Sequence, residues 1–459
     1  MTGPMRVRLS LVLAVVVGGC GGTNGGSAAT TSTSTDGGIS SGGGDHPSTS
    51  GDMGFGGPGT LGDGGVFTPP PADMGSIDHG PPITSGHVTT YGGGGDFRDV
   101  STDAGGNIWA VTPGAVYYFA NGNIYSYDQG NGLARGASTY NDAYWCIGST
   151  PCPTTDPVSF STVAGGNAGQ AFVGNIGFTG DRLDVNPSSG AVLDVVGMQV
   201  TSTQQSGTEE LSAQQAREIA SWKTIVDLNG PMNGRAYFGG FHGLSALSGM
   251  NAPMASRLCG QGCAQYEEHV HPFTSDGTQV LGRDIRAIAL TTAGDLWVGD
   301  ADSIWFMPQR SAGAGSDFFQ PFGIPGQPSA TYLDVFPGVT DDVYGIGADA
   351  AGGVWVASNG NGLAYLAPSS YAPTYFTTAT GLPQNTLTGL AIDVHGDIWM
   401  GTSSAGVARY TPSTQSWQYL TTGSGLPSND IRSINVDRFR GNGQWIWLAT
   451  DNGVAVYKP

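Results

Sequence analysis

Lysine is almost missing from this sequence of 459 residues, which holds only two, Lys223 and Lys458. Acidic residues outnumber basic residues by 36 to 17, and the formal net charge is −19. A protein that binds the phosphate backbone of nucleic acid needs a basic face, and this composition supplies none. We therefore expect no nucleic-acid partner.

Helix-forming runs are scarce as well. Residues 208–221 (TEELSAQQAREIAS) are the one segment that predicts a helix, because Thr208 precedes a first turn with acidic residues. Glycine is abundant, at 77 residues, which is typical of many short strands joined by tight turns. The expected fold class is all-β.

The first apolar run is too short to cross a bilayer. It covers residues 9–17, follows Arg6 and Arg8, and ends in Val17-Gly18-Gly19-Cys20. This tetrapeptide resembles the bacterial lipobox, which implies a signal peptide over residues 1–19, a lipidated Cys20 and a membrane anchor. By the sorting rule of that family, the next residue, Gly21, implies the outer membrane.

Residues 21–86 contain 20 glycines and no Trp, Tyr, Lys or Arg. Such a segment buries too little apolar surface to offset its ordering entropy. We predict that residues 20–86 form the lipidated N-terminus and a disordered Gly/Ser/Thr-rich linker.

Seven similar units fill the rest of the chain, residues 87–459. Each has the pattern G-x-[ILVA]-aromatic or a variant of it, at spacings of 44 to 65 residues. The seven aromatic positions are Trp109, Phe172, Tyr237, Trp297, Trp355, Trp399 and Trp447. Units of this length that each read as four short strands predict a seven-bladed β-propeller.

The last unit ends after three strands, at Tyr457. The segment at 87–99 resembles the outer strand of the preceding unit, residues 417–430. We predict that residues 87–91 supply the missing fourth strand and close the ring, which removes open strand edges.

The units also resemble a named family. Gly-Leu-Pro-x-Asn at 381–385 and 425–429, followed by an inner strand, an aspartate, a glycine turn and I-W-[ML]-[GA]-T, is similar to the two-component regulator propeller repeat. In that family the propellers are often periplasmic sensor parts of histidine kinases that respond to oligosaccharides. No kinase or transmembrane segment follows Pro459, so the resemblance implies the fold and a ligand class but not signalling.

Four cysteines remain after Cys20 and lie in two local pairs. In an exported protein an even set predicts disulfides. The expected pairs are Cys146 with Cys152 and Cys259 with Cys263. His269 and His271 have a spacing that can share a metal ion, but most such pairs are surface residues, so we expect no metal.

Three inner strands begin with Asp-x-Arg, and their arginines are Arg98, Arg286 and Arg432. At the mouth of a propeller funnel these arginines suit a carboxylate or sulfate; alternatively, each pairs with a neighbouring acid and fastens adjacent blades.

Aromatic residues beside the first cysteine pair suit stacking on a sugar, or pack down on the blade. These aromatic residues are Tyr140, Tyr144 and Trp145.

The sequence holds no local signature of catalysis, such as G-x-S-x-G, H-E-x-x-H, a phosphate-binding loop or a haem-attachment motif. We therefore expect no catalytic residue and no cofactor. His242 and His395 are candidates only for an enzyme that assembles its site from several blades.

The favoured hypothesis is a ligand-binding propeller, with a glycan as first guess. The alternatives are a protein-interaction scaffold of the cell envelope and a propeller-type lyase or hydrolase.

Overall fold

The computed structural model describes residues 83–92, 94–133, 159–176, 178–197, 221–228, 235–240, 243–247, 266–270, 285–300, 303–307, 324–325, 332–337, 343–368 and 370–459. All of them belong to one compact unit, Thr60–Pro459. They form strands and short 3₁₀ turns, with no α-helix among them. The predicted signal peptide, Cys20 and the linker up to residue 82 lie outside the described residues and stay predictions.

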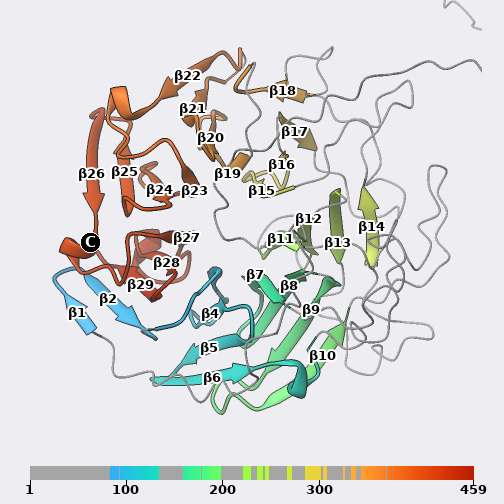
Figure 1. Ribbon diagram of the computed structural model, residues 1–459. Helices are drawn as coiled ribbons and strands as arrows, with labels where there is room; N and C mark the ends of the chain where they lie inside the picture. The colour runs from blue at the N-terminus through green and yellow to red at the C-terminus, as the bar shows by residue number, and fades with distance from the viewer. Residues whose placement is uncertain are drawn as a thin grey trace, which may run out of the picture. The chain divides into compact units, whose positions relative to one another are not determined.

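The strands form seven antiparallel sheets, six of four strands and one of five (Figure 1). The innermost strands are β3 (Asp99–Thr102), β7 (Ser159–Gly165), β11 (Ser221–Asp227), β15 (Ala287–Leu290), β19 (Val343–Ala348), β23 (Leu387–Ile392) and β27 (Ile431–Val436). The second strands are β4 (Ile108–Val111), β8 (Gln170–Ile176), β12 (Arg235–Gly240), β16 (Leu296–Gly299), β20 (Val354–Ser358), β24 (Ile398–Thr402) and β28 (Ile446–Thr450).

The third strands are β5 (Val116–Ala120), β9 (Phe178–Val185), β13 (Gly243–Leu247), β17 (Ser303–Met307), β21 (Gly362–Leu366), β25 (Val407–Thr411) and β29 (Gly453–Tyr457). The outer strands are β6 (Asn123–Tyr127), β10 (Val192–Gly197), β14 (Tyr266–Val270), β18 (Tyr332–Asp334), β22 (Pro373–Phe376), β26 (Ser416–Leu420) and β2 (Val88–Tyr91), which β1 (Ile83–Ser85) extends.

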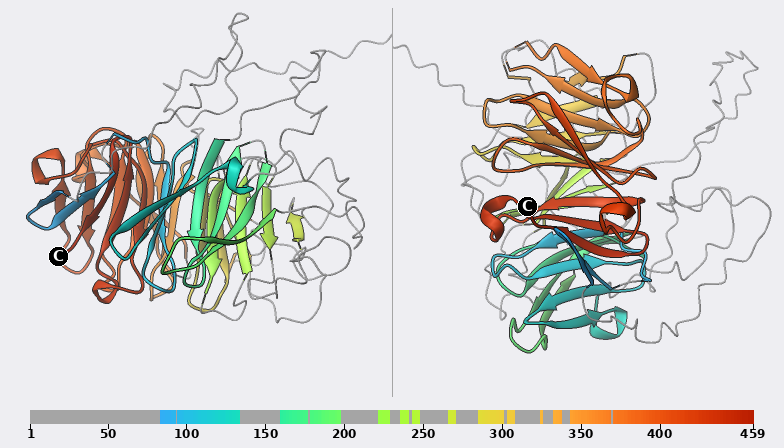
Figure 2. Two further views of the ribbon diagram at one scale, coloured as in Figure 1. Left: turned by 90° about the horizontal axis from the view of Figure 1, so that it is seen from below. Right: turned by 90° about the vertical axis from the view of Figure 1, so that its left-hand side faces the viewer.

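The seven sheets close into a ring. Each innermost strand contacts the innermost strand of the next sheet along the chain, and β27 contacts β3. Figure 1 shows the sheets around a common centre, and Figure 2 shows the same sheets from two other sides. The predicted all-β, seven-bladed β-propeller is confirmed, and each sheet is one blade. We number the blades from one to seven in the order of their innermost strands.

Second strands carry the core of each blade. In β4, β16, β20, β24 and β28 every residue is buried. Both faces of these strands are covered by neighbouring blades, so the sequence there is continuously apolar instead of alternating. The outer strand β26, in contrast, is largely exposed. This difference explains why I-W-[ML]-[GA]-T is the best-conserved part of the repeat within the chain.

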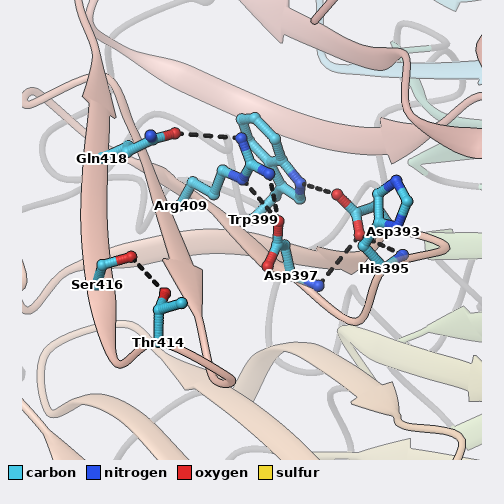
Figure 3. Close-up of polar contacts among 8 residues, drawn as sticks. All are labelled: Asp393, His395, Asp397, Trp399, Arg409, Thr414, Ser416 and Gln418. Atoms are coloured by element: carbon cyan, nitrogen blue, oxygen red, sulfur yellow. Dashed lines mark hydrogen bonds and ion pairs between the residues drawn. The ribbon is translucent and has the colours of Figure 1, made fainter.

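The repeat aromatic is fixed by an aspartate in the turn between the first two strands. In blade six the indole Nε1 of Trp399 donates to Asp393 Oδ2 at 2.9 Å (Figure 3), and the amides of His395 and Asp397 donate to Oδ1. Gly396 closes the turn with φ of +80°, which suits glycine. Trp109 and Trp447 make the same indole bond, to Asp103 and Asp437. The aspartate, the glycine and the tryptophan therefore form one structural unit.

A second unit joins one blade to the next. Between blades six and seven, Thr421 caps a short 3₁₀ turn, Gly425 adopts φ of +99° and Leu426 is buried. The Oδ1 atom of Asn429 accepts the amide of Thr422 at 2.8 Å. The exit of blade one has the same capped turn from Asp128, followed by the buried Leu133, without the Pro and Asn of the motif.

Ring closure follows the prediction. Strand β2 pairs with β29, with Val88 opposite Tyr457 and Tyr91 opposite Val454. The amide of Lys458 also donates to the carbonyl of His87 at 2.8 Å. The sheet then continues outward by one strand more than expected, because β1 pairs with β2. Among the described residues, the first strand therefore begins at Ile83, four residues before the predicted start of the propeller.

The predicted helix at 208–221 falls almost wholly outside the described residues. Its last residue, Ser221, is the first residue of strand β11.

Candidate functional site

One position near the start of each innermost strand stands out. In five blades the pairing of the first two strands skips one residue there, as at a β-bulge. In every blade this residue lies three positions before the residue that pairs with the repeat aromatic. The set, which we call the inner ring, is Arg98, Ser161, Trp222, Arg286, Tyr344, Thr388 and Arg432.

The three predicted arginines therefore occupy equivalent positions in blades one, four and seven. Two of them bind acids. The Nη2 atom of Arg98 lies 3.0 Å from Asp96 Oδ2, and that of Arg432 lies 3.1 Å from Asp430 Oδ2. The Nε atom of Arg432 also lies 3.7 Å from Asp96 Oδ1, which joins blade seven to blade one. Only the contact of Arg432 with Asp96 joins two blades, as the alternative of fastened blades requires; the other two ion pairs each lie within one segment.

The third arginine has an aromatic environment. The guanidinium carbon of Arg286 lies 5.3 Å from the centre of the Trp222 ring and 5.1 Å from that of Tyr344. Its Nη1 atom donates a hydrogen bond to the Tyr344 hydroxyl. Cation–π contacts of this kind hold a guanidinium by its faces. Arg286 therefore links the innermost strands of blades three, four and five.

A network of buried polar groups lies directly beside the inner ring. Asp99, which follows Arg98, accepts hydrogen bonds from the Thr162 hydroxyl at 2.7 Å and from the Ser433 hydroxyl. Thr162 in turn accepts the amide of Thr224 at 2.9 Å. The Nζ atom of Lys223 lies 3.6 Å from Asp99 Oδ1. This network, the Asp99 network, connects blades seven, one, two and three.

Burial and neighbouring charges both act on the acid at the junction of blades seven and one. Burial raises the pKa of the Asp430 carboxyl above its usual range, and the negative charges of Asp451 and Asp96 act in the same direction. The positive charges of Arg432 and Arg98 oppose this rise. The junction thus holds alternating donors and acceptors of both charge signs.

Several predicted site residues lie outside the described residues. They are Cys20, Tyr140, Tyr144, Trp145, Cys146, Cys152, Cys259, Cys263, His242 and His271. The backbone of His269 lies in β14, opposite Ser245. His395 is in the turn that follows β23, at the opposite end of the innermost strand from the inner ring.

The sequence reasoning missed Trp222, Tyr344, Lys223 and Asp99. Trp222 and Tyr344 stand three residues before the strand position opposite the repeat aromatic, as the arginines do. Only the pairing register reveals this equivalence, since the tripeptide Asp-x-Arg is absent from blades three and five. No group of three or more His, Cys, Asp or Glu residues that could hold a metal ion occurs among the described residues.

No protein-family model matches the sequence, and no curated protein matches it. Among solved structures, the chain is similar to the extracellular domain of a protein named as a hybrid two-component system of B. thetaiotaomicron. The TM-score is 0.50 and the identity 16%, over 80% of this chain and 39% of that chain.

The chain is also similar to YCF48 bound to D1 peptide, with a TM-score of 0.47 and 9% identity over 82% of this chain and 98% of that chain. The WD40 β-propeller domain of Doa1 gives a TM-score of 0.47 and 12% identity, over 81% and 97%. At 16% identity the likeness to the first of these structures concerns the fold alone.

Within the part of the chain that the structure describes, no helix has the length and apolar character needed to span a membrane.

Proposed function

We propose that this chain is an exported, lipid-anchored β-propeller that binds a glycan at the inner ring. The observation that carries the proposal is the composition of that ring. It holds the half-buried rings of Trp222 and Tyr344, which flank Arg286, on blades three and five, and Arg432, which is paired with Asp96 and Asp430, at the junction of blades seven and one.

Sugars and this ring are chemically complementary. A pyranose presents apolar C–H faces that stack on aromatic rings, and hydroxyl groups that both donate and accept hydrogen bonds. Carboxylates accept such bonds and guanidinium groups donate them, so a network of both kinds matches a pair of neighbouring hydroxyls. Binding sites commonly combine apolar surface with a few convergent polar groups in this way.

Export and anchoring rest on the N-terminal sequence. The signal-peptide pattern and the lipobox at Cys20 support a lipid anchor, with the outer membrane as the expected location. The similarity of the repeats to the two-component regulator propeller family supports an oligosaccharide as the ligand class. A scaffold that binds an envelope protein is the rival function.

A glycan array probed with the whole chain in detergent tests the proposal. We expect at least one oligosaccharide to bind, and Trp222→Ala or Tyr344→Ala to weaken that binding by about tenfold or more. Tyr419→Ala is the matched control, because Tyr419 is an exposed tyrosine on β26, the outer strand of blade six. Glycan binding that is equal in all three variants, or capture of an envelope protein with no glycan bound, would refute the inner-ring proposal.

A further inference from the structure

Lys223 is one of only two lysines in the chain, and it directly follows the inner-ring residue Trp222. Its side chain starts on blade three and reaches Asp99 on blade one, past blade two. Blade two carries the small Ser161 at its ring position. The Lys223 side chain keeps 28% of its surface exposed, so it remains accessible beside the ring.

The Asp99 carboxylate does not depend on Lys223 for hydrogen bonds. Oδ1 accepts the Ser433 hydroxyl and the amide of Val100 at 3.0 Å. Oδ2 accepts the Thr162 hydroxyl at 2.7 Å and the amide of Val163 at 3.1 Å. Four donors are enough to satisfy a buried carboxylate. Asp99 therefore attracts the Lys223 ammonium by charge, and the N–H donors of the ammonium stay available for a ligand.

The ammonium is held by charge rather than by a hydrogen bond. The distance of 3.6 Å from Nζ to Asp99 Oδ1 is too long for a hydrogen bond, whereas the ion pairs of Arg98 with Asp96 and of Arg432 with Asp430 are 3.0 and 3.1 Å long. Across the residues that the structure describes, this ion pair is the one polar contact of the Lys223 side chain. An ammonium group can only donate hydrogen bonds, and it has three N–H donors. A ligand that binds it must therefore supply hydrogen-bond acceptors.

We infer that Lys223 binds an acidic group of the ligand, a sugar carboxylate, and so gives the inner ring a preference for uronate-containing oligosaccharides. This inference rests on the proposed glycan binding. A carboxylate gains charge-assisted hydrogen bonds from the ammonium, while a neutral hydroxyl gains weaker ones.

The scarcity of lysine makes the test simple. The whole chain is acetylated with an amine-reactive ester, with and without uronate oligosaccharides (oligogalacturonate, oligoalginate and hyaluronan fragments), and the modified peptides are quantified by mass spectrometry. The methyl esters of the same oligosaccharides serve as neutral probes. We expect at least one acidic probe to slow acetylation of Lys223 about fivefold or more, while its methyl ester does not. Lys458 is the internal control, because it lies at the chain end over Trp445.

Binding of the same probes gives a second readout. We expect Lys223→Gln to weaken binding of the acidic probe by about tenfold and to leave binding of its methyl ester unchanged, while Lys458→Gln alters neither. Unprotected Lys223 in the presence of bound acidic probe, or equal affinity for acid and ester, would overturn the inference.

The two proposals fail in different ways. If neutral glycans bind and Trp222→Ala weakens them, but no acidic probe is preferred, the glycan site stands and the role of Lys223 is wrong. If no glycan of either kind binds, both proposals are wrong.

Discussion

Removal of strand β2 is expected to destabilise the whole ring, although it deletes very few residues. We compare three variants of the chain, which begin at residue 80, at residue 87 and at residue 92. The first keeps β1 and β2, the second keeps only β2, and the third keeps neither. The third also exposes the edge of β29, because β2 is its outer partner.

The structure sets the size of the effect. Val88 is 1% exposed and packs in the core that includes Trp399 and Leu448, so its burial is worth about 1.5–3 kcal/mol. Tyr91 packs against Trp447 and Phe119, with ring centres 5.6 and 6.0 Å apart. Its partial burial and these aromatic contacts add about 2–3 kcal/mol. The expected loss of roughly 4–6 kcal/mol is a large part of a typical stability of about 5–15 kcal/mol.

Thermal unfolding measured by circular dichroism is the assay. The variant from residue 80 should melt like the whole chain, and the variant from residue 87 should melt slightly lower. The variant from residue 92 should melt lower by on the order of 10 °C and be less soluble. If the variants from residues 80 and 92 melt at the same temperature and are equally soluble, the reasoning about closure is refuted.

Three further predictions follow from the sequence and the fold. Cys20→Ala should abolish labelling by a fatty-acid probe and release the protein from membranes; persistent membrane labelling would contradict the anchor. Reduction should raise the intact mass by about four hydrogens, and free thiols under oxidising conditions would contradict the two disulfides. Asp99→Ala should lower the unfolding free energy by about 3–5 kcal/mol in urea titrations, because it leaves two buried hydroxyls without their acceptor and Lys223 without its counter-charge. Asp128→Ala, at an exposed cap, should cost about 1 kcal/mol, and equal losses in the two variants would contradict the role of the Asp99 network.

The sequence predicts the blades because each blade repeats a local unit. The aspartate and tryptophan of the first turn lie six positions apart in blades one and six and ten apart in blade seven, and the indole donates to the aspartate in all three. Ring closure is predictable for a related reason, since residues 87–91 look like an outer strand and the last unit lacks one. Local patterns with a regular spacing therefore made the fold predictable from the sequence.

The inner ring is harder to predict, because its contacts join residues far apart in the chain. Arg286 meets Tyr344 across 58 residues, and Ser433 meets Asp99 across 334. No local spacing relates such partners, and only the register of each blade aligns them. The sequence does not predict strand β1, because an edge strand of three residues has one partner and needs no regular apolar pattern.

The pairing of β2 with β29 also means that the order of blades along the chain is open to rearrangement. Val88 lies opposite Tyr457, so a short peptide from Pro459 to His87 would make an ordinary hairpin of these two strands. New chain ends could then be cut in the exposed turn at residues 412–415, between β25 and β26. In such a circular permutant the last sheet is continuous in sequence, and the new N-terminus leaves the ring from blade six.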